Sequence, residues 1–255
     1  MARLISEVHK LDLGKNWAKK INNKRKNKED LDETKRKIKR VFTKLDEIIS
    51  EFGKKISCKN KGLAGQCRSE TKKTKPGEDE LEKVITISTD DICNQFNLVS
   101  GFVSDKFGAK RMNIDLVRRN SDGKIKQMVE LKISENKETP VAAMMQLITY
   151  FLIFCKTKNK CKQIYPADTT KTVRLIILAP KEYYENHYNT FEFCRESLIK
   201  IAKEAQDCIN KNYRRNGRKC SISFQKIEKY DENKVKDFYK KIIGIRSVVQ
   251  KWEKV

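Results

Sequence analysis

Two segments of the chain are too apolar to lie on a protein surface, and they restrict its fold more than any other feature. The first covers residues 141–155 and is interrupted by Gln146 and Thr149. Thr139 and Pro140 precede it, and these residue types favour the N-cap and the first turn of a helix. We therefore expect a buried helix that starts there, ends with the apolar stretch and is too short to span a bilayer.

The second apolar segment covers residues 173–179 and reads Val-Arg-Leu-Ile-Ile-Leu-Ala before Pro180. A nearly continuous apolar run that stops at a proline is typical of a central strand covered on both faces. An amphipathic helix over about residues 189–212 and an alternating strand over residues 220–227 follow it. Strands and helices that cover one another predict an α/β fold.

Two further strands precede the apolar helix and are expected to form a hairpin. They cover roughly residues 112–119 and 124–133, and an Asp-Gly pair between them is a strong turn signal. With Asp-Gly as a two-residue loop, cross-strand residue numbers sum to 245, so Asp115 lies directly opposite Glu130. The Cβ atoms of such a pair are about 4.5–5.5 Å apart. A four-residue loop would leave Glu130 as a diagonal neighbour of Asp115.

Upstream of the hairpin, residues 81–97 predict a mostly helical segment and residues 98–103 a short strand. The expected order is then helix, three strands, helix, strand, helix, strand. This order describes a mixed central sheet flanked by helices, in one domain over residues 76–255.

Residues 1–75 form a basic extension, with 23 Lys or Arg against 10 Asp or Glu. Apolar residues recur there at helical spacing and predict an amphipathic helix that ends near Gly53, followed by a linker over residues 54–80. The helix either packs on the main domain or mediates a homodimer, and its basic face is either solvated or in contact with phosphates. The apolar stripe consists of Leu31, Ile38, Phe42, Leu45, Ile49 and Phe52.

The charge of the whole chain points to a polyanionic partner. The sequence has 57 Lys or Arg and 34 Asp or Glu, which gives a net charge of +23. Solubility alone favours a net charge of about 2–8 in a small domain. Nucleic acid is the simplest partner for the surplus, ahead of a membrane surface.

The eight cysteines are expected to be reduced thiols. No apolar signal segment follows the first residues, so we expect an intracellular, cytoplasmic protein without a membrane anchor. The spacings from Cys58 to Cys67 and from Cys155 to Cys161 fit neither a zinc ribbon nor an iron–sulfur cluster.

Strand alternation gathers two acids and a lysine on one face of the expected hairpin. Glu130 and Lys132 face one way, and the apolar residues beside them face the other. Ile114 and Leu116 flank Asp115 in the same sense. Two carboxylates at this separation can share a divalent cation. Because Glu-x-Lys is common in a lysine-rich chain, an exposed ladder of salt bridges is the alternative.

The apolar helix supplies a second signal. Gln146 and Tyr150 stand four residues apart, and therefore on one face, in an otherwise apolar segment. Their polar groups need partners or water. A satisfied pair of core residues is the ordinary interpretation, but this pair gains weight because it follows the Glu-x-Lys strand.

These residues carry a resemblance to a known family. Ile114-Asp115, Glu130-Leu131-Lys132 and the Gln146 to Tyr150 segment follow one another on a strand, a strand and a helix. The arrangement resembles the PD-(D/E)xK nuclease superfamily, with the Gln-x-x-x-Tyr feature of its RecB-like branch. The resemblance covers roughly residues 80–228 and implies a restriction-endonuclease-like fold with an αβββαβ core.

The sequence departs from the pattern of that superfamily in two places. Ile114 stands where Pro is usual. The acid that is usual on the helix before the sheet has no clear match. Glu82 is the first candidate, with Glu80 and Asp91 behind it.

The resemblance implies a metal-dependent deoxyribonuclease that hydrolyses phosphodiester bonds, with duplex DNA as its expected substrate, in restriction, defence, repair or recombination. Asp115, Glu130 and Lys132 would be its catalytic residues. Asp115, Glu130 and the Leu131 carbonyl would bind Mg²⁺ or Mn²⁺. Lys132 would orient or help deprotonate the attacking water and stabilise charge on the phosphate. Gln146 and Tyr150 would bind phosphates or support the metal site.

A basic turn before the last strand offers phosphate contacts or is an ordinary solvated turn. Its candidate residues are Arg214, Arg215, Arg218 and Lys219. Two other functions stay open: a non-catalytic nucleic-acid-binding module with a remnant site, and a nuclease of the same fold that acts on RNA or branched DNA. The presence of a lysine beside both acids argues against a remnant.

Overall fold

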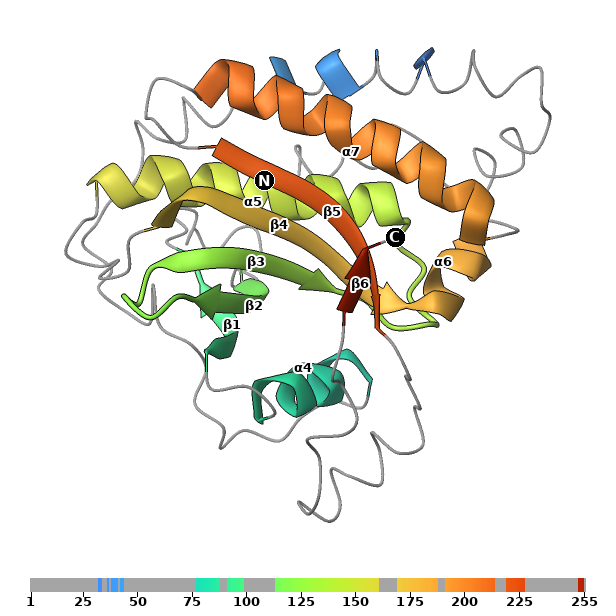
Figure 1. Ribbon diagram of the computed structural model, residues 1–255, viewed down its shortest axis with the longest axis horizontal. Coiled ribbons are helices and arrows are strands. Elements are labelled where there is room, and N and C mark those ends of the chain that lie inside the picture. The colour runs from blue at the N-terminus through green and yellow to red at the C-terminus, as the bar shows by residue number, and fades with distance from the viewer. Residues whose placement is uncertain are drawn as a thin grey trace, which may run out of the picture.

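The computed structural model shows a mixed sheet between two layers of helices (Figure 1). It describes residues 32–33, 36, 38–40, 42–43, 77–87, 91–98, 113–160, 169–187, 191–213, 219–227 and 252–254. The strands are β1 (Ile92–Asn97), β2 (Asn113–Arg119), β3 (Ile125–Leu131), β4 (Thr169–Pro180), β5 (Lys219–Ile227) and β6 (Trp252–Lys254). The helices are α4 (Glu78–Ile87), α5 (Pro140–Lys160), α6 (Lys181–His187) and α7 (Phe191–Tyr213).

The strands lie side by side in the order in which they follow along the chain. β1, β2 and β3 are antiparallel neighbours, whereas β3, β4 and β5 are parallel neighbours, and the short β6 pairs antiparallel with β5 at one edge. α5 and α7 cover one face of the sheet and α4 covers the other (Figure 1). The predicted α/β class with a mixed sheet flanked by helices is confirmed, and α6 and β6 are additions to the predicted order.

The first predicted elements have the wrong boundaries. The helix expected over residues 81–97 ends at Ile87, and β1 takes residues 92–97. The strand expected over residues 98–103 is therefore wrong at Leu98, which follows β1, while residues 99–103 lie outside the described part of the chain.

The spacing of Ile92 and Phe96 is also compatible with a helix, although the segment is a strand. Apolar residues four apart are typical of a helix, but here Ile92 packs on the α4 side of the sheet and Phe96 on the α5 side. The strand changes face between them because Gln95 has a positive φ of 50°. A regular strand would have placed both side chains on one face.

The apolar helix begins as predicted and runs further than expected. The backbone N–H of Ala142 donates to Thr139 Oγ1 at 3.2 Å, which confirms the N-cap, and α5 continues to Lys160. By length and composition, Pro140–Lys158 is long enough to cross a membrane, so the expectation of a helix too short to do so is wrong. In this structure 83% of that window is buried, so its placement as a core helix is confirmed.

The described part of the N-terminal stripe packs on the main domain. Ile38 and Phe42 are buried in the same core as α5 and α7. Lys39 Nζ lies 3.1 Å from Glu204 Oε1 on α7. Among the residues described, the stripe is therefore covered by its own chain, which leaves these two apolar residues unavailable to a second copy. The remaining stripe residues, Leu31, Leu45, Ile49 and Phe52, lie outside the described part.

The expectation that all thiols are reduced is wrong at Cys93 in β1, which is disulfide-bonded. Cys155, Cys208 and Cys220 are not in disulfide bonds. Disulfide pairing requires two cysteines to meet in space, and spacing along the sequence does not determine which of them do.

The hairpin of β2 and β3 reaches the predicted register by a different route. Leu116 pairs with Val129, a pair that sums to 245. The loop is longer than predicted, because the Asn120 N–H donates to the Lys124 carbonyl at 2.9 Å across three residues that end with Gly123. A one-residue register shift nearer the loop compensates for the extra residue. The loop length was wrong, but the predicted register is confirmed for Leu116, Val117 and Arg118.

The backbone of Gly123 generates the first prediction. Its φ is +72°, and nothing lies within 4 Å of the position that a Cβ would take. The cost of a side chain is therefore conformational, and Gly123→Ala should lower the free energy of unfolding by about 1 kcal/mol in urea denaturation. Gly123→Asn should lose clearly less, because Asn tolerates this conformation. Equal losses would contradict this cause.

Candidate active site

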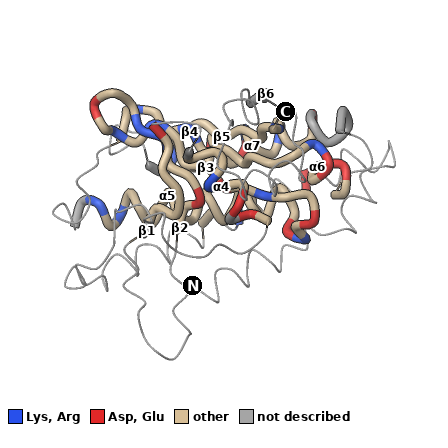
Figure 2. Tube along the Cα trace, turned by 90° about the horizontal axis from the view of Figure 1, so that it is seen from below, with Lys and Arg blue, Asp and Glu red and all other residues tan. Residues whose placement is uncertain are grey.

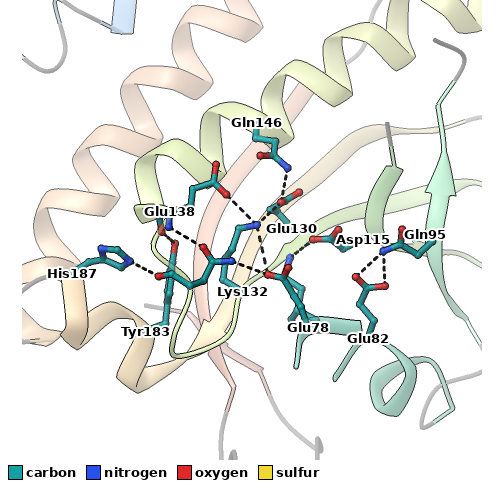
Figure 3. A network of polar contacts seen from close by, with 12 residues as sticks. Glu78, Glu82, Gln95, Asp115, Glu130, Lys132, Glu138, Gln146, Tyr183 and His187 are labelled. Carbon is teal, nitrogen blue, oxygen red and sulfur yellow. Dashed lines mark hydrogen bonds and ion pairs between the residues drawn. The ribbon is translucent and has the colours of Figure 1, made fainter. Parts of the chain in front are cut away.

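Asp115, Glu130 and Lys132 come together where β3 ends (Figure 3). Lys132 Nζ lies 2.7 Å from Glu130 Oε1. The backbone N–H of Leu131, between these two residues, donates to Asp115 Oδ2 at 2.8 Å. The antiparallel pairing of β2 with β3 thus brings an acid from one strand to the Glu-x-Lys segment of the other.

Strand alternation in β3 sends its charged and apolar residues to opposite faces, as predicted. Val129 and Leu131 lie in the core on the α4 side. Glu130 accepts a hydrogen bond from α5, and Lys132 follows it on the same side. Both charged residues are almost completely buried, with 1% and 4% of their surface exposed. The alternative of an exposed salt-bridge ladder is therefore wrong.

Asp115 does not follow the alternation that was predicted for β2. Ile114 lies in the core on the α5 side and Leu116 in the core on the α4 side, so they do not flank Asp115 in the same sense. The irregularity coincides with Gln95 on β1, whose neighbours pair with Ile114 and Leu116 and whose φ is +50°. The Asp115 carboxylate consequently reaches along the sheet to the Leu131 N–H instead of standing on one face.

Glu130 is buried and only half satisfied. Its Oε1 atom accepts from Gln146 Nε2 at 2.8 Å and from Lys132 Nζ at 2.7 Å. Its Oε2 atom is buried without a hydrogen-bond partner among the residues described. Burial, followed by the charge of Asp115, raises the pKa of Glu130 well above its ordinary value. A further positive charge near Oε2 would therefore stabilise the ionised form of Glu130.

The same cluster shifts its other titratable groups. Burial is the main cause that raises the pKa of Asp115 to about 7, although Lys132 and the Leu131 N–H act against it. Burial would lower the pKa of Lys132, but the surrounding carboxylates, Glu130 above all, outweigh it and raise that pKa. Lys132 is therefore a cation at neutral pH, in contact with Glu130, whose pKa is raised.

Two acids near Lys132 were missed by sequence reasoning. Glu138 Oε2 lies 3.2 Å and Glu78 Oε1 lies 3.7 Å from Lys132 Nζ. Glu78 is the first residue of α4 and lies in the segment predicted to be a linker. Glu138 directly precedes the Thr139 N-cap, and this adjacency to the helix start was the signal that could have placed it near the end of β3.

Gln146 and Tyr150 both contribute to this cluster from α5. Gln146 holds Glu130 directly through its amide. Tyr150 packs against the core on the α5 side and is partly buried. Burial and then the charges of Glu130 and Asp115 raise the pKa of Tyr150, so its hydroxyl remains protonated at neutral pH. Gln146 therefore reaches the site, whereas the described contacts of Tyr150 are with the core on the α5 side.

The acids proposed for the helix before the sheet have other partners. Both carboxylate oxygens of Glu82 accept from Gln95 Nε2, at 2.8 and 2.7 Å. Glu80 accepts from the Gly77 N–H at 3.3 Å and so caps α4. Asp91 pairs with Arg118 Nε at 2.7 Å. Among the described acids of α4, Glu78 is the one in contact with Lys132.

The basic turn is not close to this cluster where it is described. Arg214, Arg215 and Arg218 lie outside the described residues. Lys219 pairs with Thr172 on β4, whereas Glu130 pairs with Ile177 on the same strand. Five residues of strand correspond to roughly 17 Å, so Lys219 lies towards the other end of the sheet.

The segments around the cluster are acidic although the chain is basic. Asp and Glu are prominent on α4 and beside α6 (Figure 2). α4 carries four acids and one lysine. The surplus of positive charge in the sequence is therefore not concentrated on these elements.

The cluster fits a divalent cation through oxygen atoms from two strands. Glu130 Oε2 lacks a partner in the described part of the chain, and Asp115 lies beside it. In an extended strand the N–H and C=O of one residue point to the same edge, so the Leu131 carbonyl also faces the Asp115 side. No group of three Asp, Glu, His or Cys side chains within the described ranges forms a metal site by itself. A cation here would depend on the backbone carbonyl and on water as well.

The raised pKa of Asp115 predicts a pH dependence of stability without metal. The folded pKa of about 7 lies above the ordinary value of 3.8. In this pH range the folded state therefore keeps a proton on Asp115 that the unfolded state releases. The stability that this proton contributes is lost as the pH rises from about 4 to about 7. In EDTA, the free energy of unfolding of the unmutated protein should fall between pH 5.5 and pH 7.5 by about 1–2 kcal/mol more than that of Asp115→Asn. Urea denaturation at the two pH values measures this difference.

The control for this measurement is Asp122→Asn, the same change at an exposed position of the hairpin loop. It should leave the difference between the two pH values unchanged. An Asp115→Asn protein with the pH dependence of the unmutated chain would contradict the burial of this charge.

Comparisons with known proteins add no relative to this geometry. No protein-family model, no curated protein and no solved structure matches the chain.

Proposed function

We propose that this protein is a metal-dependent DNA nuclease with a restriction-endonuclease-like fold, in which Asp115, Glu130 and Lys132 are the catalytic residues. The observation that carries the proposal is the buried cluster itself. An acid from β2 and a Glu-x-Lys segment from β3 meet at a strand end, and one carboxylate oxygen there has no partner in the described structure. Buried carboxylates are costly unless a cation or hydrogen bonds satisfy them.

The order of elements supports the same proposal. One helix, three antiparallel strands, a helix and a parallel strand follow one another, which agrees with the αβββαβ core that the resemblance to the PD-(D/E)xK superfamily implies. Asp115 lies on β2, Glu130 at the end of β3 with Lys132 directly after it, and Gln146 on α5, an order that supports the proposal.

Mg²⁺ or Mn²⁺ would be held by Glu130, Asp115 and the Leu131 carbonyl. When bound, such a cation polarises a phosphoryl oxygen and lowers the pKa of a water molecule. Gln146 fixes Glu130 through Oε1 and leaves Oε2 for the cation. The protein residues therefore prepare one carboxylate oxygen for this purpose.

Lys132 would act as a donor of charge and hydrogen bonds. Its pKa is raised by the carboxylates around it, so it keeps its proton at neutral pH. This favours orientation of the attacking water and stabilisation of negative charge on the phosphate over removal of a proton from water. Tyr150 also keeps its proton and can donate to a phosphate oxygen.

Cleavage assays on several substrates test this function directly. Supercoiled plasmid, linear duplex, single-stranded DNA and RNA would each be incubated with Mg²⁺, with Mn²⁺ or with EDTA. We expect cleavage of DNA with either metal and none with EDTA. Cleavage of RNA alone would make RNA, and not DNA, the substrate of the proposed nuclease. Cleavage of none of these substrates would favour a non-catalytic binding module.

Lys132→Ala should reduce cleavage by about 100-fold or more, because charge on the phosphate loses its buried donor. DNA binding should stay near normal in a gel-shift assay. Lys126→Ala is the control, since Lys126 lies on β3, the strand that Lys132 follows, but pairs with Asp91 at 3.2 Å, away from the cluster. Near-normal cleavage by a folded Lys132→Ala protein would disprove the assignment.

A further inference from the structure

The loop between β3 and α5 is fastened to α6 by three side chains. The Tyr183 hydroxyl donates to the Glu138 carbonyl at 2.7 Å, and Asn186 Nδ2 donates to the Ser134 carbonyl at 2.9 Å. His187 Nε2 lies 3.0 Å from the Asn136 carbonyl. Because a carbonyl can only accept, this places the proton of the imidazole on Nε2. These three residues are called the α6 anchors below, and the segment 133–139 is called the acidic loop.

The acidic loop carries side chains to the cluster. Glu138 Oε2 lies 3.2 Å from Lys132 Nζ. Asn136 Nδ2 donates to Glu78 Oε1 at 3.3 Å, and Asn136 Oδ1 accepts from the Glu138 N–H at 2.9 Å. Figure 3 shows these contacts as one continuous network from His187 and Tyr183 to Lys132. Each α6 anchor thus holds a carbonyl of the segment that supplies a counter-ion to Lys132.

The backbone of the acidic loop is otherwise held at its two ends, where the Lys132 N–H donates to the Leu178 carbonyl and the Ala143 N–H donates to the Thr139 carbonyl, both at 2.9 Å. Residues 132–139 belong to neither strand nor helix. Within the described backbone, the hydrogen bond from the Asn136 N–H to the Ile133 carbonyl at 3.1 Å is the internal one. The position of Glu138 therefore depends on the contacts from α6 together with the start of α5, and a displacement of about 1 Å in a reacting group can cost about 100-fold in rate.

We propose that the α6 anchors are positioning residues for Lys132. They fix the acidic loop, the loop fixes Glu138, and Glu138 directs the Lys132 ammonium so that Glu130 does not hold it alone. The effect on cleavage rests on the proposed nuclease function, whereas the effect on Lys132 itself does not.

Two adjacent tyrosines provide a matched test. Tyr183 and Tyr184 are both fully buried, and both hydroxyls donate to backbone carbonyls. The Tyr184 hydroxyl, however, contacts the carbonyls of Ile177 and Gln225 in the sheet, at 3.0 Å each. Tyr183→Phe and Tyr184→Phe therefore each remove one buried hydroxyl, but only the first releases the acidic loop.

The kinetic test separates positioning from general damage. Tyr183→Phe should lower the cleavage rate at saturating DNA by about 10-fold without changing KM, while Tyr184→Phe should stay within about twofold. Glu138→Gln should lower the rate similarly. In the double variant, Tyr183→Phe should add little to Glu138→Gln, because both act through one contact. Additive losses would overturn the proposal.

A spectroscopic test does not require cleavage. The ammonium signal of Lys132 would be observed by ¹⁵N NMR and assigned by its absence in Lys132→Arg. We expect it to shift or exchange faster in Tyr183→Phe and to stay unchanged in Tyr184→Phe. If Tyr183→Phe fails to fold, Asn186→Ala at an exposed position tests the same loop.

The two failures are distinguishable. An unchanged Lys132 signal in Tyr183→Phe and in Asn186→Ala would overturn the role of the anchors, even if the protein cleaves DNA. A protein that cleaves no substrate, but whose Lys132 signal responds to Tyr183→Phe and not to Tyr184→Phe, would keep the positioning role and reject the nuclease.

Discussion

The burial of Glu130 is the constraint on which the rest of the cluster depends. A carboxylate with 1% of its surface exposed loses nearly all its contacts with water. Within the described structure, one of its oxygens has no hydrogen bond that replaces them. Lys132 and Gln146 both contact the other oxygen. Asp115, Glu78 and Glu138 add negative charge around a single ammonium group, so the site is electrostatically incomplete. Burial together with this imbalance raises the pKa values of Glu130, Asp115 and Glu78, and it supports the proposal that a cation binds here.

Much of this centre could be predicted because it is built from neighbouring segments. The alternation of β3 and the four-residue spacing on α5 are local, and both place Glu130, Lys132 and Gln146 correctly. The register of the hairpin was right although its loop was wrong, since a bulge restores the pairing that buries Leu116 and Val129. A slip by one residue would turn these side chains to the wrong layer, so burial selects the register and the loop adapts to it.

The rest could not be predicted, because it depends on contacts between distant segments. Glu78 and Glu138 become partners of Lys132 only when α4 and the acidic loop pack near the end of β3. The positive φ of Gln95 has no signal in its residue type, yet Ile114 and Leu116 change faces beside it. Glu82 was chosen by its place on the helix, but its carboxylate is taken up by Gln95.

The parallel pairing of β3 with β4 accounts for the link between α6 and Lys132. Parallel strands end at the same edge of a sheet, so the segments that follow them meet there. Leu131 at the end of β3 pairs with Leu178, close to the end of β4. The acidic loop follows the first strand and α6 follows the second, which makes their contact a consequence of topology. A single side chain spans each of the Tyr183 and Asn186 contacts, because the sheet has already brought the two segments together. The proposed catalytic cluster and the helix that contacts its acidic loop are thus positioned by the same pair of strands.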